Sequence, residues 1–427
     1  MKILNFKKTI KNYTWATVLL IGVLTLGITS CSDDDGTDVD PGGQEIESAW
    51  WSSYEVRAPE GDIYYLTVTE DIPTDFNASS AVELGFEQTV IAVEDNIYVY
   101  NPSAQTITKW SVDRTDLSLS VEGILSVATT GIPSGALINP TVVSETEAYL
   151  HRLEEGIMVE WNPADMTITE VHQVEPLVPI HGDNGVALTL DTYVRGEKVI
   201  IPILDSRPLE CCDVGANDNI GARVAVFDIN SKILEYKSDE RLAYTFFISP
   251  TDENGRIYIQ PNNNGAVLWE YFNIDPSQTP SPHTLLRLNE DGSSFDPNFS
   301  FDFDDVLDIG MFNLASFVFD NKIVLSYWDN EDGELPPNYG DAFSIRANPL
   351  TLVSVDLDNG DVEPFTALDK YNTILFVSRV DGVNYFLGIS GEFGNDDTHF
   401  LRQNGLDDFT ELSSFEGAFG RGLGKLW

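Results

Sequence analysis

Basic residues are scarce in this chain. It has 24 lysines and arginines against 69 aspartates and glutamates in 427 residues, which gives a formal net charge of −45. Such a charge repels the phosphate backbone of nucleic acids and anionic lipid surfaces, so we expect no nucleic-acid partner. Because 42% of the residues are hydrophobic and 11% aromatic, the composition is still that of a folded protein.

Cysteine and catalytic motifs are also scarce. Of the three cysteines, Cys211 and Cys212 are adjacent and could form a strained vicinal disulfide or stay reduced. The CxxC, HExxH, GxSxG, Walker A and GxGxxG patterns are absent, and the five histidines are scattered. The acidic stretches 329–333 and 356–360 resemble fragments of calcium loops but lack the full ligand spacing. We therefore predict no metal, no cofactor and no enzymatic activity.

Residues 1–30 have the pattern of a signal peptide. Four lysines in the first eleven residues precede an apolar run over 15–28, which is shorter than the roughly 20 residues that cross a bilayer. The run ends in Thr29, Ser30 and Cys31, a small residue before a lone cysteine, as in a lipobox. The alternatives are an ordinary cleaved signal and a single membrane anchor. We predict cleavage before Cys31 and lipidation of its sulfur.

Residues 31–47 form the predicted tether. Aspartate, glycine, proline, serine and threonine dominate this segment, which has almost no apolar content and cannot build a core. A disordered tether of this length has an r.m.s. reach of roughly 20–25 Å. The folded body is then predicted to be a single β-propeller over residues 48–427.

The body reads as strands, and one hairpin pattern recurs. An apolar strand end, an acidic or amide residue and a second apolar strand follow one another, as in residues 159–171 and 226–236. Asparagine and aspartate suit such turns because their side chains bond the local backbone and tolerate left-handed φ. The turns fall roughly 40–65 residues apart, as in a propeller of four-stranded blades. The predicted turn residues are Glu70, Asp113, Asn162, Asp228, Asn289, Asp356 and Asn404.

Seven such turns predict an all-β fold, a seven-bladed β-propeller with each turn between the third and fourth strands of a blade. The segment 419–427 would supply the inner strand of the blade that begins near residue 50, so that the two ends of the chain close the ring and leave no free sheet edge. Six or eight blades and a pair of β-sandwiches remain as alternatives.

The long intervals predict a binding face. The extra residues fall between second and third strands, at 205–222, 261–283, 328–349 and 391–399, and these loops share one face of a propeller with the links between blades. Loops that lengthen on one face commonly form a binding surface. Aromatic side chains could stack on a ligand there and arginines could pair with its oxygens. The predicted ligand-binding residues are His181, Arg207, Arg223, Arg241, Trp269, Tyr271, Trp328, Tyr339, Arg346 and Arg421.

The signal, the acidic residues after Cys31, the hairpins and the terminal GRGLGKLW segment together resemble a family of Bacteroidetes surface lipoproteins with a seven-bladed propeller. That family includes a xenosiderophore-utilisation lipoprotein that captures ferric enterobactin. The resemblance implies a monomer on the outer surface of the outer membrane, held there only by its lipid. It would bind a small anionic ligand, such as a ferric siderophore, for a TonB-dependent receptor. A propeller that binds or degrades polysaccharide and a protein-interaction scaffold are the alternative functions.

Overall fold

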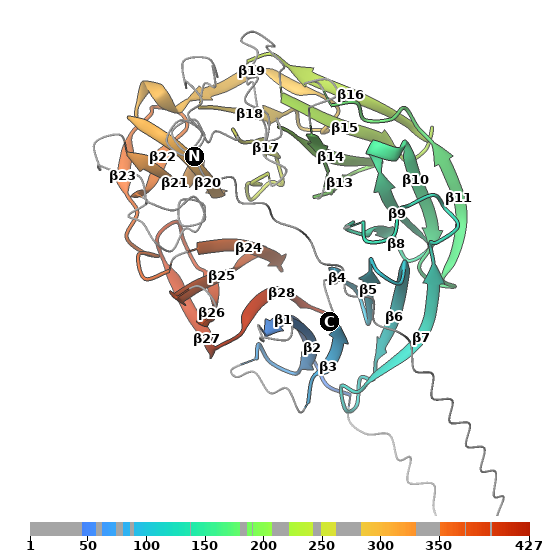
Figure 1. The fold of residues 1–427 in the computed structure, drawn as a ribbon. Coiled ribbons are helices and arrows are strands. Elements are labelled where there is room, and N and C mark those ends of the chain that lie inside the picture. The colour runs from blue at the N-terminus through green and yellow to red at the C-terminus, as the bar shows by residue number, and fades with distance from the viewer. Residues whose placement is uncertain are drawn as a thin grey trace, which may run out of the picture. The chain divides into compact units, whose positions relative to one another are not determined.

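The computed structural model describes residues 45–427 except 57–61, 74–79, 86–88, 137, 180–185, 190, 207–221, 242–248, 262–282, 330–350, 372 and 393–394. Within the described residues, seven antiparallel sheets follow one another around a ring (Figure 1). The predicted seven-bladed β-propeller is therefore confirmed, and the six-bladed, eight-bladed and sandwich alternatives are wrong.

The first three blades take up the first part of the body and the last strand of the chain. Blade 1 contains β28 (Phe419–Lys425), β1 (Trp50–Val56), β2 (Ile63–Thr69) and β3 (Val82–Gly85). Blade 2 contains β4 (Thr89–Val93), β5 (Asn96–Asn101), β6 (Thr106–Val112) and β7 (Leu119–Ser126). Blade 3 contains β8 (Thr141–Ser144), β9 (Glu147–Arg152), β10 (Ile157–Asn162) and β11 (Thr167–Gln173), with a short 3-10 helix η1 (Leu153–Glu155) after β9.

The other four blades follow in chain order. Blade 4 contains β12 (Val186–Leu188) and β13 (Tyr193–Arg195), which both pair with β14 (Lys198–Ser206), then β15 (Ala222–Asp228) and β16 (Ile233–Asp239). Blade 5 contains β17 (Tyr258–Ile259), β18 (Thr284–Leu288) and β19 (Phe295–Asp302), followed by the 3-10 helix η4 (Phe303–Asp305). Blade 6 contains β20 (Ile309–Phe319), β21 (Lys322–Asp329), β22 (Thr351–Asp356) and β23 (Val362–Pro364). Blade 7 contains β24 (Thr373–Val380), β25 (Val383–Glu392), β26 (Asn395–Gln403) and β27 (Phe409–Glu416).

The predicted closure of the ring by its two ends is confirmed. Strand β28 pairs with β1 over the register Trp50–Lys425 to Glu55–Phe419 and becomes the first strand of blade 1. Glycine is needed here because the ring of Trp51 lies against this strand: a Cβ on Gly422 would come within 2.7 Å of the ring, and one on Gly424 within 2.5 Å. The alternating glycines of the GRGLG segment thus make room for the aromatic residue that seals the ring.

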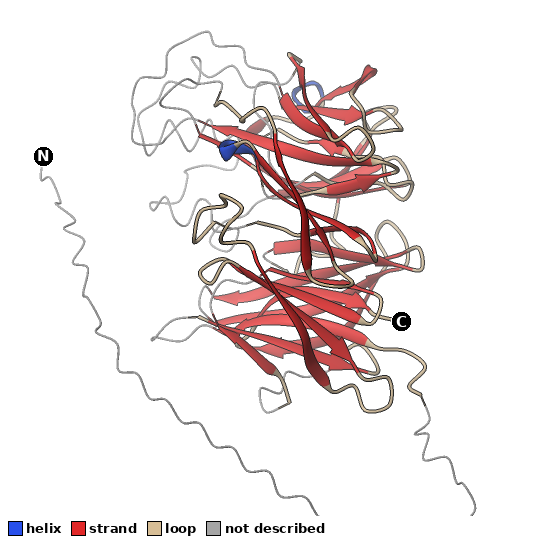
Figure 2. Cartoon of the chain, turned by 90° about the vertical axis from the view of Figure 1, so that its right-hand side faces the viewer, coloured by secondary structure: helices blue, strands red, loops and turns tan. Residues whose placement is uncertain are grey.

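Each predicted turn residue ends or directly follows the next-to-last strand of its blade, which is the third strand in the blades with four described strands, as expected. Local hydrogen bonds explain why these residues form turns: the Asp113 carboxylate accepts from the backbone N–H of Thr115 at 2.7 Å, and the Asn162 side-chain oxygen accepts from that of Ala164 at 2.9 Å. We call the side of the propeller that carries these turns and the first-to-second-strand turns the turn face. The opposite side, with the second-to-third-strand connections and the links between blades, is the loop face. The two faces form the two edges of the strands in Figure 2.

The core is divided into clusters between neighbouring blades. Between blades 2 and 3, for example, Tyr98, Leu150 and Trp161 are buried together, and the rings of Tyr98 and Trp161 meet edge to face with centroids 5.5 Å apart. Between blades 7 and 1, the ring of Tyr54 packs on Phe415 at 5.3 Å. Burial of these aromatic surfaces stabilises each blade through its neighbour, which fixes the ring that carries the surface turns.

One loop prediction is wrong. Residues 391–399 were expected to form a long loop, but most of them belong to the hairpin of β25 and β26, in which Glu392 pairs with Asn395. The polar residues there are part of the two strands and not of a loop, because backbone hydrogen bonds between strands form regardless of side-chain polarity. The lengthened second-to-third-strand connections are therefore those of three blades, 4, 5 and 6.

Candidate functional site

Most of the predicted loop-face site lies outside the described residues. This applies to His181, Arg207, Trp269, Tyr271, Tyr339 and Arg346. Trp328 belongs to β21, where it pairs with Met311 of β20, and only its backbone is described. The ligand-binding role of these residues stays a prediction.

Arg241 is the best-defined member of the predicted set. Its guanidinium grips the Asp239 carboxylate with Nε and Nη2, and it also donates to the backbone oxygens of Asp296 at 2.8 Å and Phe299 at 2.9 Å. These bonds fasten blade 4 to the outer strand β19 of blade 5. The hydrogen bond to Asp239 raises the pKa of Arg241. The Arg241 side chain thus forms its hydrogen bonds within the protein and links blades 4 and 5.

The other two described arginines lie in separate blades. Arg421 is within β28 of blade 1, not in a link between blades, and it contacts the buried carboxylate of Glu55 and the hydroxyl of Tyr64. Partial burial lowers the pKa of Arg421. Arg223 is a partly buried residue of β15 in blade 4, opposite Ser238 of β16. Arg223 and Arg421 therefore belong to two blades that are not neighbours in the ring.

A different group of arginines converges on the turn face, at the end of blade 5. A cavity of about 610 Å³ opens there. Its lining consists of Arg195, Asn254, Arg256, Arg287, Leu288, Glu290 and Asp296, and we call it the arginine pocket. Its volume lies in the range of roughly 300–1,000 Å³ that is usual for small-molecule sites.

Arg195 comes to the pocket from the neighbouring blade. It is the last residue of β13 in blade 4, and its Nε donates to the backbone oxygen of Glu290 at 2.9 Å. Its Nη1 donates to the backbone oxygens of Asn254 at 2.9 Å and Gly255 at 2.8 Å. Arg195 therefore holds both turns of blade 5 in place, the one before β17 and the one after β18.

Arg256 is oriented by a buried carboxylate. Its Nε donates to Asp252 at 2.5 Å, and the Asp252 side chain is only 1% exposed. The backbone oxygen of the same aspartate accepts from Nη1 of Arg379, which comes from β24 of blade 7, at 3.1 Å. The side chain of Glu253 accepts from the backbone N–H of Asp320 in blade 6 at 3.3 Å. Blades 4, 6 and 7 thus all brace this one turn.

Arg287 completes the pocket from β18. Its Nη2 donates to Asp296 at 2.6 Å, and its guanidinium lies over the Phe299 ring, 4.3 Å from the centroid. Although burial lowers the pKa of Arg287, hydrogen bonds to Asp296 and to the Tyr258 hydroxyl raise it overall. The guanidinium is therefore held in one orientation and stays charged at every physiological pH.

The pocket can bind an oxyanion. Within the part of the chain that the structure describes, Nη2 of Arg195 and both terminal nitrogens of Arg256 have no hydrogen-bond partner, and Arg287 keeps N–H groups in reserve beyond its two bonds. Fixed guanidinium forks pair well with carboxylate, phosphate or catecholate oxygens. The three arginines are balanced by Glu290, Asp296 and Asp252, so the pocket is locally neutral on a chain of net charge −45.

Sequence reasoning left Arg195 and Arg379 out of the predicted binding residues; they lie at the ends of the first strands β13 and β24, away from the loop face. It missed the pocket, because Arg256 and Arg287 are 31 residues apart in the chain and meet only through blade 5. One signal was available: Arg195, Arg256 and Arg379 lie within a few residues of first-to-second-strand turns, which share one face in any propeller.

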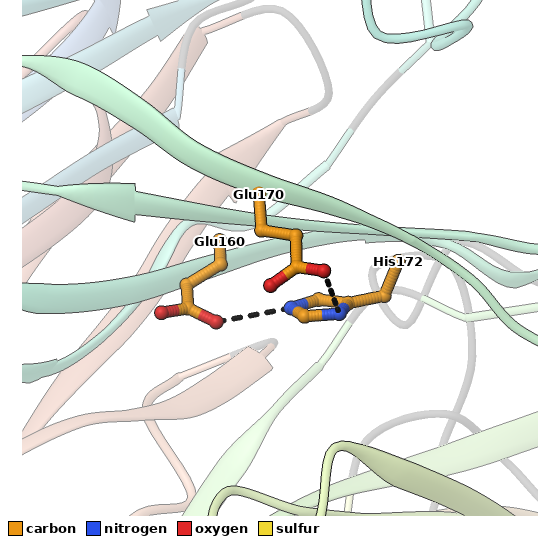
Figure 3. Close-up of side chains that lie close together, drawn as sticks. All are labelled: Glu160, Glu170 and His172. Atoms are coloured by element: carbon orange, nitrogen blue, oxygen red, sulfur yellow. Dashed lines mark hydrogen bonds and ion pairs between the residues drawn. The ribbon is translucent and has the colours of Figure 1, made fainter.

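A second polar cluster lies between blades 3 and 4 (Figure 3). Glu160 of β10 contacts Nε2 of His172 at 3.0 Å, and Glu170 of β11 contacts Nδ1 of the same ring at 3.8 Å. The three side chains have the ligand types of a metal site. However, Nζ of Lys232 is 2.8 Å from the same Glu160 oxygen and 2.9 Å from Glu147.

Lys232 explains this cluster without a metal ion. Burial raises the pKa of Glu160, but hydrogen bonds from Lys232 and His172 outweigh it and lower that pKa overall. Burial likewise lowers the pKa of Lys232, but its bonds to Glu160, Tyr149 and Glu147 raise it overall. Because Lys232 already neutralises the Glu160 carboxylate, the cluster acts as a network of ion pairs that joins blade 3 to the turn that carries Lys232 in blade 4.

No model of a known protein family matches the chain, and no curated protein matches it. Among the described residues, no helix is long and apolar enough to span a membrane.

Solved structures resemble the chain at low identity. A protein of Bacteroides fragilis with the provisional name 6-phosphogluconolactonase is 12% identical, with a TM-score of 0.47, over 92% of this chain and 99% of its own. A protein of Lactobacillus plantarum is 10% identical, with a TM-score of 0.46, over 89% and 99%. BamB of Moraxella catarrhalis is 8% identical, with a TM-score of 0.35, over 82% and 80%. These likenesses concern the fold and say nothing of the ligand.

Proposed function

We propose that this protein is a lipid-anchored binding protein of the outer cell surface. It captures a small anionic ligand of the ferric-siderophore class and delivers it to a TonB-dependent receptor of the outer membrane. The arginine pocket carries the ligand part of the proposal, and the pattern around Cys31 carries the anchor.

The pocket supports capture rather than structural bracing alone. An arginine that only braces the fold uses its N–H groups on protein acceptors, as Arg241 does with the Asp239 carboxylate and the backbone oxygens of Asp296 and Phe299. Arg256 instead has one carboxylate partner at Nε, among the described residues, and lines the cavity. A buried aspartate that fixes one edge of a guanidinium leaves the other edge preorganised for a ligand oxygen, which lowers the ordering cost of binding.

Charge chemistry supports a compact, multiply charged ligand. The chain as a whole repels anions, but charges beyond about 8 Å are screened at physiological salt, so the three guanidinium groups and the carboxylates paired with them decide affinity. A ferric tris-catecholate presents several oxygen atoms around one metal centre and can engage two or three guanidinium forks together.

Fluorescence titration tests the proposal. The purified lipoprotein in detergent would be titrated with ferric enterobactin, which is anionic, and with a neutral ferric tris-hydroxamate as the matched iron complex. We expect saturable quenching by the catecholate at micromolar concentration or below, weaker at high salt, and far weaker quenching by the hydroxamate. No saturation below about 1 mM across a panel of anionic siderophores would refute the siderophore assignment. Turnover of a glycan by the same preparation would instead favour the polysaccharide function.

A further inference from the structure

The folded body begins on the turn face. The backbone N–H of Ile46 donates to the oxygen of Arg114 at 2.8 Å, and the Ile46 oxygen accepts from the indole N–H of the C-terminal Trp427 at 3.0 Å. The backbone N–H of Leu426 donates to the oxygen of Ala49 at 2.8 Å. Residues 46–49 are therefore fastened to the last residues of the chain.

The partners of this segment place it clearly. Arg114 belongs to the third-to-fourth-strand turn of blade 2, and its guanidinium grips Asp95 in the first-to-second-strand turn of the same blade. It also lies over the ring of Trp427, 4.7 Å from the centroid. Both turns belong to the turn face, and Figure 2 shows the C terminus at that edge of the strands. Any segment that precedes Glu45 must join the body there.

The arginine pocket opens on the same face. It is built from Arg195 at the end of β13, Asn254 in the turn before β17 and Glu290 in the turn after β18. The three long second-to-third-strand connections leave the opposite face. One face thus holds both the attachment point and the arginine pocket.

We propose that the turn face looks toward the membrane, so that the arginine pocket opens into the space between propeller and bilayer and the loop face looks away from the cell. This rests on the proposed lipid anchor at Cys31. The predicted reach of the tether is roughly 20–25 Å. A seven-residue strand such as β1 spans about 23 Å, so the tether would have to pass the full height of a blade to turn the loop face toward the lipid.

The charge of the body keeps that space open. A chain of net charge −45 is repelled by an anionic bilayer surface, so the turn face stands off from the lipid and does not lie on it. The turn face is then separated from the bilayer by a layer of water, and it faces the receptor that lies in the membrane. A ligand in the pocket would already face the receptor, and delivery would not require the propeller to turn over.

Energy transfer to the membrane tests the orientation, with two matched positions in blade 3. Glu145 is exposed in the turn between β8 and β9 on the turn face, and Glu155 is exposed in η1 on the loop face. Each would be changed to cysteine, with Cys211 and Cys212 changed to serine, and labelled with the same donor. Both variants lose one carboxylate, so the labelled proteins differ only in the face that carries the donor.

The lipidated proteins would be reconstituted in vesicles that contain an acceptor-labelled lipid. We expect a greater loss of donor fluorescence from Glu145→Cys than from Glu155→Cys, and the difference should shrink when a long Gly-Ser segment is inserted before Glu45. Equal or reversed transfer from vesicle-bound protein would overturn the orientation while the anchor stands. Protein that does not bind vesicles, or that binds them equally well as Cys31→Ala, would overturn the proposed anchor itself.

Discussion

The double variant Arg256→Gln/Arg287→Gln is expected to bind an anionic ferric siderophore about 100-fold more weakly than the natural protein. A hydrogen bond to a charged group contributes about 1.5–3 kcal/mol, so each lost fork costs tenfold or more in affinity. The change also frees Asp252 and Asp296, whose carboxylates now neutralise these arginines at 2.5 and 2.6 Å and would then repel the anion.

Arg402→Gln is the matched control for this experiment. Arg402 is an exposed residue of β26 in blade 7, and its side chain donates a hydrogen bond to Asn404 at 3.1 Å. It does not line the arginine pocket, so its loss changes the net charge without touching the pocket. Thermal unfolding of both variants would show that the propeller persists. Unchanged affinity in a folded double variant would remove the arginine pocket from the ligand site and return attention to the loop face.

Asp191→Asn is expected to stabilise the protein at pH 7 by about 2–3 kcal/mol. Burial raises the pKa of Asp191 to about 6, whereas an aspartate in the unfolded chain has a pKa near 3.9. Between these values the unfolded state releases its proton while the folded state keeps it. The free energy of unfolding therefore falls as the pH rises from about 4 to about 6, and the loss persists at higher pH.

The measurement for Asp191 is the difference in unfolding free energy between variant and natural protein across pH 4 to 7. The difference is used because His151 titrates in the same pH range with the opposite effect on stability. Burial lowers the pKa of His151 to about 4, so the free energy of unfolding that it contributes falls as the pH drops below about 6.5. Other groups cancel in the comparison. A pH-independent difference would show that Asp191 ionises normally in the folded protein.

Much of the fold could be predicted because its repeating turns depend on hydrogen bonds between residues that are close in the sequence. The Asn and Asp turns form bonds within two or three residues, as Asp113 does with Thr115, so their spacing needs no knowledge of the tertiary structure. Ring closure was predictable because the terminal segment 419–427 could supply the missing inner strand of the first blade, as β28 does beside β1. The hairpin over 391–399 was not, because its polar residues look like a loop and only the paired backbone makes them strands.

The candidate site, in contrast to the fold, could not be predicted from local sequence patterns. Loop length pointed to the loop face, whereas the described arginine pocket depends on the packing of blades 4, 5 and 7 around the turn that contains Asp252. No spacing along the chain connects Arg195 with Arg287. Even so, the scarcity of basic residues was informative, since in a chain of 24 lysines and arginines the arginines that converge on one turn stand out.

Locating iron in crystals of the protein grown with ferric enterobactin tests the central proposal most directly. Anomalous scattering at the iron absorption edge gives the metal position without assumptions about the ligand. We expect a single iron site beside the guanidinium groups of Arg256 and Arg287 on the turn face. An iron site among the second-to-third-strand connections of blades 4 to 6, or none in crystals at saturating ligand, would contradict it.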